Sequence, residues 1–355
     1  MIGLCRIDNL MTEYKQVQQY LLICIDVAEE SRGDHMLRQL KLQWSVSPQL
    51  VLLSIVKKCL LTFLPMDNII VERINRYRQH ILRNWFAIKY ADIVKRYCGM
   101  TETAKPFDKH DKPVVWLLWM QGKSQIPESC RVCVESILRQ NSNVRLLDYD
   151  EAMNLVSIPD KIREGYEAGR VKPAHVADYI RFALLEQYGG IWMDVSLLQL
   201  RPTPPDVFEV PFFSVKGLLR FPYASAMPLG RQWQVYYMAS WPHALFNRIM
   251  LSLLEAYYSE YDVDVDYFVT YYMAQLTMTI GLIHNEYNMI PSNNIKCEQL
   301  NTMIERSEYA DSDVLNVLNN DSTWFYKCST HYREEEQHKM RHYLQLYIRQ
   351  HQTKE

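Results

Sequence analysis

One segment, residues 172–196, constrains what this chain can fold into more than any other part of its sequence. It reads KPAHVADYIRFALLEQYGGIWMDVS. Pro173 suits the first turn of a helix, where a missing N–H has no consequence, and apolar residues then surround almost the whole predicted helix. Gly189 and Gly190 tolerate the positive φ that ends a helix, and the apolar run after them favours a buried strand. We therefore expect Asp194 at the mouth of a strand, where open α/β sheets bind ligands.

Three charged residues of this segment are candidates for a functional site. Asp178 and Arg181 lie three positions apart on the predicted helix, so their side chains can be neighbours. They form either a buried ion pair that stabilises the fold or a polar patch that faces a hydroxylated ligand. Asp194 either holds Mg²⁺ or Mn²⁺, which bind carboxylates together with substrate phosphates, or caps the turn that follows it. Spacing alone leaves both questions open.

The composition narrows the class of protein. An apolar fraction of 48% is ample for a core, and a net charge of −2 gives no broad electrostatic grip on nucleic acid. No run of about 20 uncharged apolar residues is present, because Lys57 and Lys58 interrupt the nearest candidate. The start of the chain lacks the pattern of a signal peptide, and the eight cysteines are scattered. We therefore expect a cytoplasmic protein with reduced thiols, active in the cytoplasm or at the inner face of the membrane.

Two of the cysteines, Cys130 and Cys133, match the spacing of a redox pair or of half a zinc site. No second Cys-x-x-Cys pair follows them in the sequence. The simpler interpretation is that they are two small apolar residues on one face of a helix.

The chain divides into two predicted regions, a helical region at 1–105 and an α/β domain at 106–355. A polar connector rich in Lys and Pro separates them. Within the first region we expect one long helix over 66–97 with a basic face. Such a helix can lie on an anionic membrane surface, or it can dock on the main domain with its charged face in solvent.

The second region alternates between apolar runs and helical patterns, which predicts a mainly parallel sheet. Strands are expected at 114–119, 144–148, 191–193 and 212–215, and an apolar aromatic run covers 233–239. Helices are expected at 127–139, 151–169, 173–188, 243–258, 267–281, in part of 293–318, and from 331 onward. Residues 324–327 are expected to form a late strand or turn.

The order Ala177-Asp178-x-x-Arg181, then Gly189-Gly190, then a strand that ends at Asp194, resembles the signature of glycosyltransferases with the DXD motif. Within that superfamily it is most similar to the capsular polysaccharide synthesis branch. That branch is related to the yeast initiating mannosyltransferases and distantly to clostridial glucosylating toxins. Segments 113–122, 154–175, 266–268 and 290–294 are also similar to this family. The resemblance covers about 66–339.

The resemblance implies a GT-A fold, in which a Rossmann-like domain binds a UDP- or GDP-sugar. It assigns Asp178 and Arg181 to the donor sugar and Asp194 to Mn²⁺ or Mg²⁺ against the diphosphate. Ser196 stands where the motif often has a second aspartate, and its hydroxyl is a weaker, neutral metal ligand. Trp116 either stacks on the nucleotide base or is a core residue. The donor-binding residues that the resemblance implies are Trp116, Gln121, Gly122, Ala177, Gly189 and Gly190.

Two further charged features have open interpretations. Asp262, Asp264 and Asp266 either bind a cation or cap the helix predicted to start at residue 267, and capping is the simpler explanation. Lys327 either reaches a phosphate or is a solvated surface lysine, and we expect the latter.

The resemblance predicts a hexosyltransferase that moves a sugar from a nucleotide-sugar to a hydroxyl of a bacterial surface polysaccharide precursor, such as capsule, exopolysaccharide or O-antigen. The acceptor would be a glycan or a lipid-linked glycan. Its relatives mostly act with retention, and the leaving diphosphate then assists the acceptor, so no protein base is assigned. One alternative is a non-catalytic homologue that binds nucleotide-sugar or glycan as an assembly partner. Another is a glycoside hydrolase, for which the sequence shows no signature.

Overall fold

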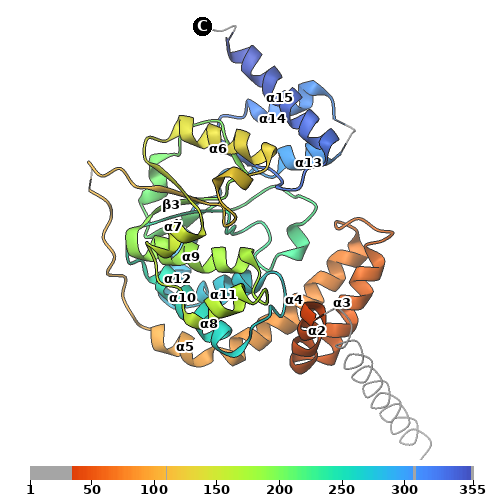
Figure 1. The fold of residues 1–355 in the computed structure, drawn as a ribbon, viewed down its shortest axis with the longest axis vertical. Coiled ribbons are helices and arrows are strands. Elements are labelled where there is room, and N and C mark those ends of the chain that lie inside the picture. The colour runs from red at the N-terminus through yellow and green to blue at the C-terminus, as the bar shows by residue number, and fades with distance from the viewer. Residues whose placement is uncertain (1–33, 109, 307–308, 353–355) are drawn as a thin grey trace, which may run out of the picture.

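The computed structural model describes residues 34–108, 110–306 and 309–352, and its centre is a five-stranded sheet (Figure 1). The strand order is β2-β1-β3-β6-β5. Strand β1 pairs in parallel with both β2 and β3, whereas β6 pairs antiparallel with β3 and with β5. The strands are β1 (Val115–Leu118), β2 (Val144–Leu147), β3 (Gly190–Met193), β5 (Phe212–Ser214) and β6 (Tyr237–Ser240). The fold is therefore mixed α/β, with β6 alone running against the other four strands.

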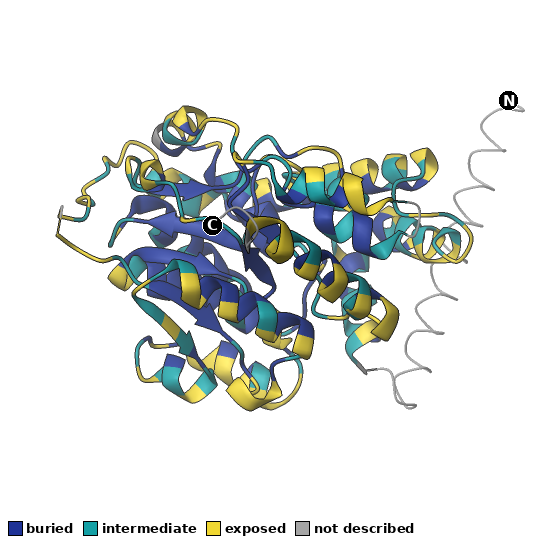
Figure 2. Ribbon diagram, turned by 90° about the horizontal axis from the view of Figure 1, so that it is seen from above, coloured by how far each residue is buried: buried dark blue, intermediate teal, exposed yellow. Residues whose placement is uncertain are grey.

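Helices cover this sheet, so the central strands are buried on both faces (Figure 2). This burial explains why the strands read as continuous apolar runs rather than as alternating patterns. The principal helices of this region are α6 (Glu128–Gln140), α7 (Tyr149–Met153), α8 (Asp160–Glu167), α9 (Pro173–Tyr188), α10 (Leu245–Glu260) and α11 (Val269–Thr277). The strands and helices expected between residues 114 and 199 are present with boundaries shifted by a few residues, except that the helix and turn expected at 151–169 form two helices, α7 and α8.

The junction between α9 and β3 needs glycine at both positions. Gly189 and Gly190 have φ values of 62° and 98°. A Cβ on Gly190 would lie 2.3 Å from the carbonyl oxygen of Val114, and one on Gly189 would lie 2.7 Å from that of Ser240. The two glycines therefore let the helix end against the strands on either side of β3, and their role is structural.

The N-terminal helices are α2 (Asp34–Val46), α3 (Pro48–Leu60), α4 (Ile69–Lys89) and α5 (Ala91–Tyr97). The prediction of one helix over 66–97 is wrong, because α4 ends at Lys89 and a separate helix, α5, follows after Tyr90. Phe86 of α4 is buried and stacks on Tyr272 of α11, with ring centroids 5.3 Å apart. The apolar face of α4 is thus occupied by the main domain, as the docked-helix alternative expected. The boundary at 105–113 stays a prediction, and the first 33 residues lie outside the described part of the chain.

A second, two-stranded sheet was not predicted from the sequence. Strand β4 (Leu197–Gln199) pairs antiparallel with β7 (Phe325–Lys327), and Leu197 faces Lys327 in this register. The helix expected at 267–281 is present as α11 but is shorter, because it ends at Thr277 and a separate helix, α12 (Gly281–Met289), follows. The remaining helices are α13 (Gln299–Glu305), α14 (Asp311–Leu318) and α15 (Glu334–Gln352). Among the described helices, none is long and apolar enough to cross a membrane.

Candidate active site

A cavity of about 630 Å³ opens at the carboxyl ends of β1 and β3. The end of β1 and the residues after it, from Leu118 to Gln121, form one part of its wall, and the residues that follow β3 form another. Asp178, Arg181, Asp194 and Ser196 all line it. The structure therefore brings together the four residues that the resemblance assigned to the donor sugar and the metal motif, at the edge where ligands bind in α/β sheets.

The Asp194 carboxylate lies at the centre of a network of donors. Its Oδ1 accepts hydrogen bonds from Arg181 Nη2 (3.1 Å) and Trp192 Nε1 (3.0 Å), and its Oδ2 accepts one from Lys327 Nζ (3.3 Å). Burial opposes ionisation of this carboxyl, but Lys327 and Arg181 outweigh it and hold the pKa of Asp194 below its usual range. Asp194 is therefore an anion poised between two cations.

Arg181 joins the two carboxylates of the site. Its Nη1 donates to Asp178 Oδ1, and its guanidinium carbon lies 4.6 Å from the centre of the Trp192 ring. Asp178 Oδ2 accepts a hydrogen bond of 2.6 Å from Thr270 Oγ1. Asp178 and Arg181 form an ion pair and also line the cavity. The geometry therefore fits both alternatives, the ion pair that stabilises the fold and the polar patch that faces a ligand.

Lys327 is not the solvated surface lysine that we expected. Its side chain is 23% exposed and lies over the cavity, where it bonds both Asp194 and Ser196 Oγ. Burial alone would lower its pKa, but Asp194 and Glu298 act in the opposite direction and the pKa of Lys327 is raised. The pairing of β4 with β7 is what places this lysine beside the motif.

The oxygen atoms of Asp194 and Ser196 are the ligands that the resemblance assigned to a divalent cation. Both face one ammonium group, that of Lys327, so a positive charge already has a place between them. An ionised carboxylate and a hydroxyl, completed by substrate phosphates and water, form a set of ligands that fits Mg²⁺ or Mn²⁺. The described residues contain no cluster of three His, Cys, Asp or Glu side chains that could hold a metal by themselves. Substrate oxygens would therefore supply much of the coordination.

A buried acid–histidine contact supports the wall of the cavity. His175 Nε2 lies 2.8 Å from Asp264 Oδ2, an ion pair without hydrogen-bond geometry, and Tyr258 donates to Asp264 Oδ1 at 2.8 Å. Burial lowers the pKa of His175, but Asp264 and Asp178 outweigh it and leave that pKa raised. His175 is a residue that sequence analysis missed, although it lies within the segment 172–196.

The acidic run at 262–266 does not cap α11 as a whole, because that helix begins at Val269. Its members have separate partners: Asp262 pairs with Arg38 and Arg170, Asp264 with His175, and Asp266 with Arg78. Only Asp266 accepts a local turn hydrogen bond, from the N–H of Phe268 at 3.0 Å. The capping explanation is therefore wrong for most of the run.

The predicted donor-binding residues divide into two groups. Gln121 and Ala177 line the cavity. Trp116, Gly122, Gly189 and Gly190 are not among the described residues that line it. Trp116 is 1% exposed and its indole N–H donates to the Gly189 carbonyl at 2.8 Å, so the expectation that it stacks on a base is corrected to a core role.

Aromatic residues other than Trp116 line the cavity. The aromatic side chains in the cavity wall are Trp119, Trp192, Tyr236, Tyr267, Phe268 and Tyr271. Tyr267 is 61% exposed and therefore available for stacking on a ligand. The signal for it was present, since it lies in the 266–268 segment that is similar to the family. Cys130 and Cys133 are both buried on α6, in agreement with their simpler interpretation.

Three comparisons relate the chain to known proteins. A model of the family described as capsular polysaccharide synthesis protein matches residues 66–347 of the 355. O-glycosyltransferase PaGT from Phomopsis amygdali is 28% identical over 125 residues, which cover 31% of this chain and 30% of that relative. The solved structure of PaToxG Glycosyltransferase is 14% identical and has a TM-score of 0.34, over 57% of this chain and 79% of that one.

Proposed function

This chain belongs to the capsular polysaccharide synthesis protein family, and from that premise we propose that it is a glycosyltransferase of the GT-A type. The reaction would move a sugar from a nucleotide-sugar to a hydroxyl of a surface polysaccharide precursor. The observation that carries the proposal is the cluster of Asp178, Arg181, Asp194 and Lys327 in one cavity at the strand mouths. Similarity to a protein named as an O-glycosyltransferase supports it.

The charges of the cavity suit a donor with a diphosphate. Transfer leaves additional negative charge on the diphosphate, and fixed cations in a partly dry site stabilise that charge. Lys327 and Arg181 are the cations, and both are held in place by Asp194. Asp178, fixed by Arg181 and Thr270, would accept hydrogen bonds from hydroxyls of the donor sugar. The exposed ring of Tyr267 would cover one face of the ligand.

Asp194 and Ser196 would hold Mn²⁺ or Mg²⁺, and the cation would add its charge to the neutralisation of the diphosphate. The remaining work belongs to the chain itself. It would orient the donor and hold the acceptor hydroxyl in position. Positioning is the main contribution of a transferase in which no side chain acts as a general base. We propose retention of configuration, with the leaving diphosphate as the proton acceptor.

One specific observation favours a second candidate function, a non-catalytic homologue that binds the nucleotide-sugar. Lys327 bonds both oxygens of the motif, so the protein carries a built-in cation where the motif would bind a metal. A panel of UDP- and GDP-sugars, with and without Mn²⁺, separates the two functions by nucleotide release. Wild-type protein should release nucleotide with at least one donor, and Asp194→Asn should not. Binding of a donor without release by the wild type would favour the second candidate.

A further inference from the structure

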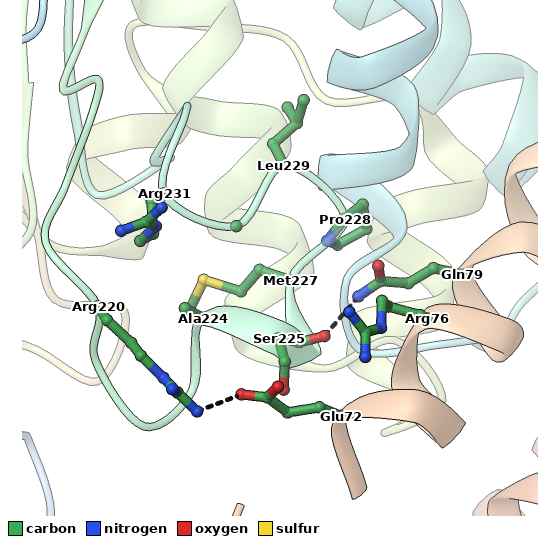
Figure 3. A pocket seen from close by; sticks show the side chains of 11 residues that line it. Glu72, Arg76, Gln79, Arg220, Ala224, Ser225, Met227, Pro228, Leu229 and Arg231 are labelled. Carbon is green, nitrogen blue, oxygen red and sulfur yellow. Dashed lines mark hydrogen bonds and ion pairs between the residues drawn. The ribbon is translucent and has the colours of Figure 1, made fainter. Parts of the chain in front are cut away.

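A second cavity, of about 440 Å³, lies between α4 and the segment 220–231 (Figure 3). Three arginines from different parts of the chain surround it. Arg76 comes from α4, and Arg220 and Arg231 come from the facing segment. We call this cavity, with its three arginines, the arginine groove.

The arginine groove has an excess of positive charge. Its one acidic lining residue, Glu72, forms an ion pair of 2.8 Å with Arg220, so these two charges offset each other. Arg76 and Arg231 are exposed, and neither guanidinium has a hydrogen-bond or ion-pair partner among the described residues. Two arginines that have no side-chain partner among the described residues therefore line one cavity.

The backbone around the groove is held firmly. Gln79 and Asn75 of α4 donate to the carbonyl and hydroxyl oxygens of Ser225, at 2.8 and 3.1 Å. Gly230 has a φ of 50°, and a Cβ there would lie 3.2 Å from a carbonyl oxygen of the same loop. The positive φ of Gly230 thus turns the chain immediately before Arg231. The backbone that carries the arginines is therefore held in place, and binding of a ligand would order their exposed side chains.

The arginine groove adjoins the candidate active site. Met227 lines both cavities, so the segment 224–231 separates them by little more than its own width. The donor diphosphate already has Lys327 and Arg181 in the first cavity. Arg76 and Arg231 of the groove are therefore available to bind the acceptor, which is the second substrate. A guanidinium binds a carboxylate or a phosphate through two parallel hydrogen bonds.

We propose that the arginine groove binds a carboxylate or phosphate group of the acceptor glycan, and that the acceptor is therefore anionic. The inference that this ligand is an acceptor rests on the proposed transferase function. Neutral sugars offer no ion pair to Arg76 and Arg231, so the groove would select acceptors by charge.

The test uses three probes and the full chain. A fluorescent oligogalacturonate hexamer carries carboxylates, maltohexaose of the same length is neutral, and inorganic pyrophosphate supplies phosphate. Binding is measured for wild type, for Arg76→Gln/Arg231→Gln, and for the control Arg73→Gln/Arg96→Gln. The control removes two exposed arginines that do not line the groove, with the same change in net charge. Thermal unfolding checks that every variant is folded.

Wild type should bind oligogalacturonate or pyrophosphate at least tenfold more tightly than maltohexaose, and the anion whose affinity falls in the groove variant identifies the group. Two exposed ion pairs together account for about a tenfold change, so the groove variant should lose that factor and the control should keep it. Arg76→Lys/Arg231→Lys, which keeps the charge without the planar fork, should bind with intermediate affinity. Equal affinity for charged and neutral probes, or equal losses of affinity in the groove and control variants, would refute the proposal that the arginine groove binds an anion.

Nucleotide release by the wild type is measured separately, without any acceptor. This assay tests the proposed transferase function independently of the binding of anions in the arginine groove. A protein that binds the anionic probe in the groove but releases no nucleotide from any donor would refute the transferase and leave the anion site. One that releases nucleotide but does not distinguish the probes would refute the anion site and leave the transferase.

Discussion

Replacing Asp194 by asparagine should destabilise the protein as well as inactivate it. The substitution keeps the size of the side chain but removes the charge that holds two cations, Arg181 at 6% and Lys327 at 23% exposure. Removing one partner of a buried ion pair typically costs about 3–5 kcal/mol. Arg181 keeps Asp178, and Lys327 keeps the field of Glu298. We therefore expect the lower end of that range, about 3 kcal/mol.

This magnitude translates into a measurable thermal shift. The entropy of unfolding is about 2.1 cal/mol/K per residue, which for 355 residues is about 0.75 kcal/mol/K. A loss of about 3 kcal/mol then lowers Tm by about 4 °C. Nucleotide release should fall about a hundredfold or more, as is typical when one fixed electrostatic group of an active site is removed. The matched control is Asp92→Asn, because Asp92 is 95% exposed and should shift Tm by less than about 1 °C.

A double-mutant cycle with Lys327→Met tests the reasoning directly. Once Asp194 is neutral, the lysine is an unpaired cation, so removing it should restore part of the lost stability. The double variant should therefore be more stable than the sum of the single changes by about 1 kcal/mol or more. Additivity within about 0.3 kcal/mol would show that the two charges do not interact, and the proposed charge network would then be wrong.

Three further substitutions test other parts of the structure. Lys327→Met should lower nucleotide release more without Mn²⁺ than with it, since the metal can supply the missing charge; equal losses in both buffers would contradict this. The pKa of His175 is raised by Asp264 despite burial, so its stabilisation is present below pH 6.5 and lost as pH rises through the folded value. His175→Gln should therefore reduce the urea midpoint more at about pH 5.5 than at about pH 9, and a constant difference would refute the assignment. Gly190→Ala should abolish soluble expression because of the 2.3 Å approach to a carbonyl oxygen, whereas Gly281→Ala, with open space around it, should express normally.

The part of the site that could be predicted from the sequence is the part built from one continuous segment. Asp178, Arg181 and Asp194 are close in the chain, and a helix, a glycine junction and a strand suffice to bring them together. Local rules for helix spacing and glycine conformation determine that geometry. The resemblance then assigned roles to the same residues, and the cavity they line is consistent with those roles.

The rest of the site depends on contacts that local patterns do not encode. Lys327 reaches Ser196 across 131 positions, through a pairing of two strands of three residues each. Strands that short show no reliable periodicity. The prediction that Trp116 stacks on a base was wrong for a different reason. All four residues of β1 are buried, so the apolar run of this strand does not indicate which side chains face a ligand. The partners of the acidic run, such as Arg78 for Asp266, lie far away in the sequence.

Lys327, which the sequence could not place, offers a physical reason for the serine in the proposed metal motif. Asp178 and Asp194 supply two negative charges to the cavity, and Arg181 and Lys327 supply two positive ones. This cluster is neutral without a metal. Ser196 is 1% exposed, so an aspartate in its place would add a buried, uncompensated charge, which is costly unless a cation is bound. A hydroxyl there accepts from Lys327 without disturbing the balance. The serine in place of a second aspartate therefore matches the charge that Lys327 supplies. The charged groups of the cluster can hold one another in place before any metal or diphosphate binds.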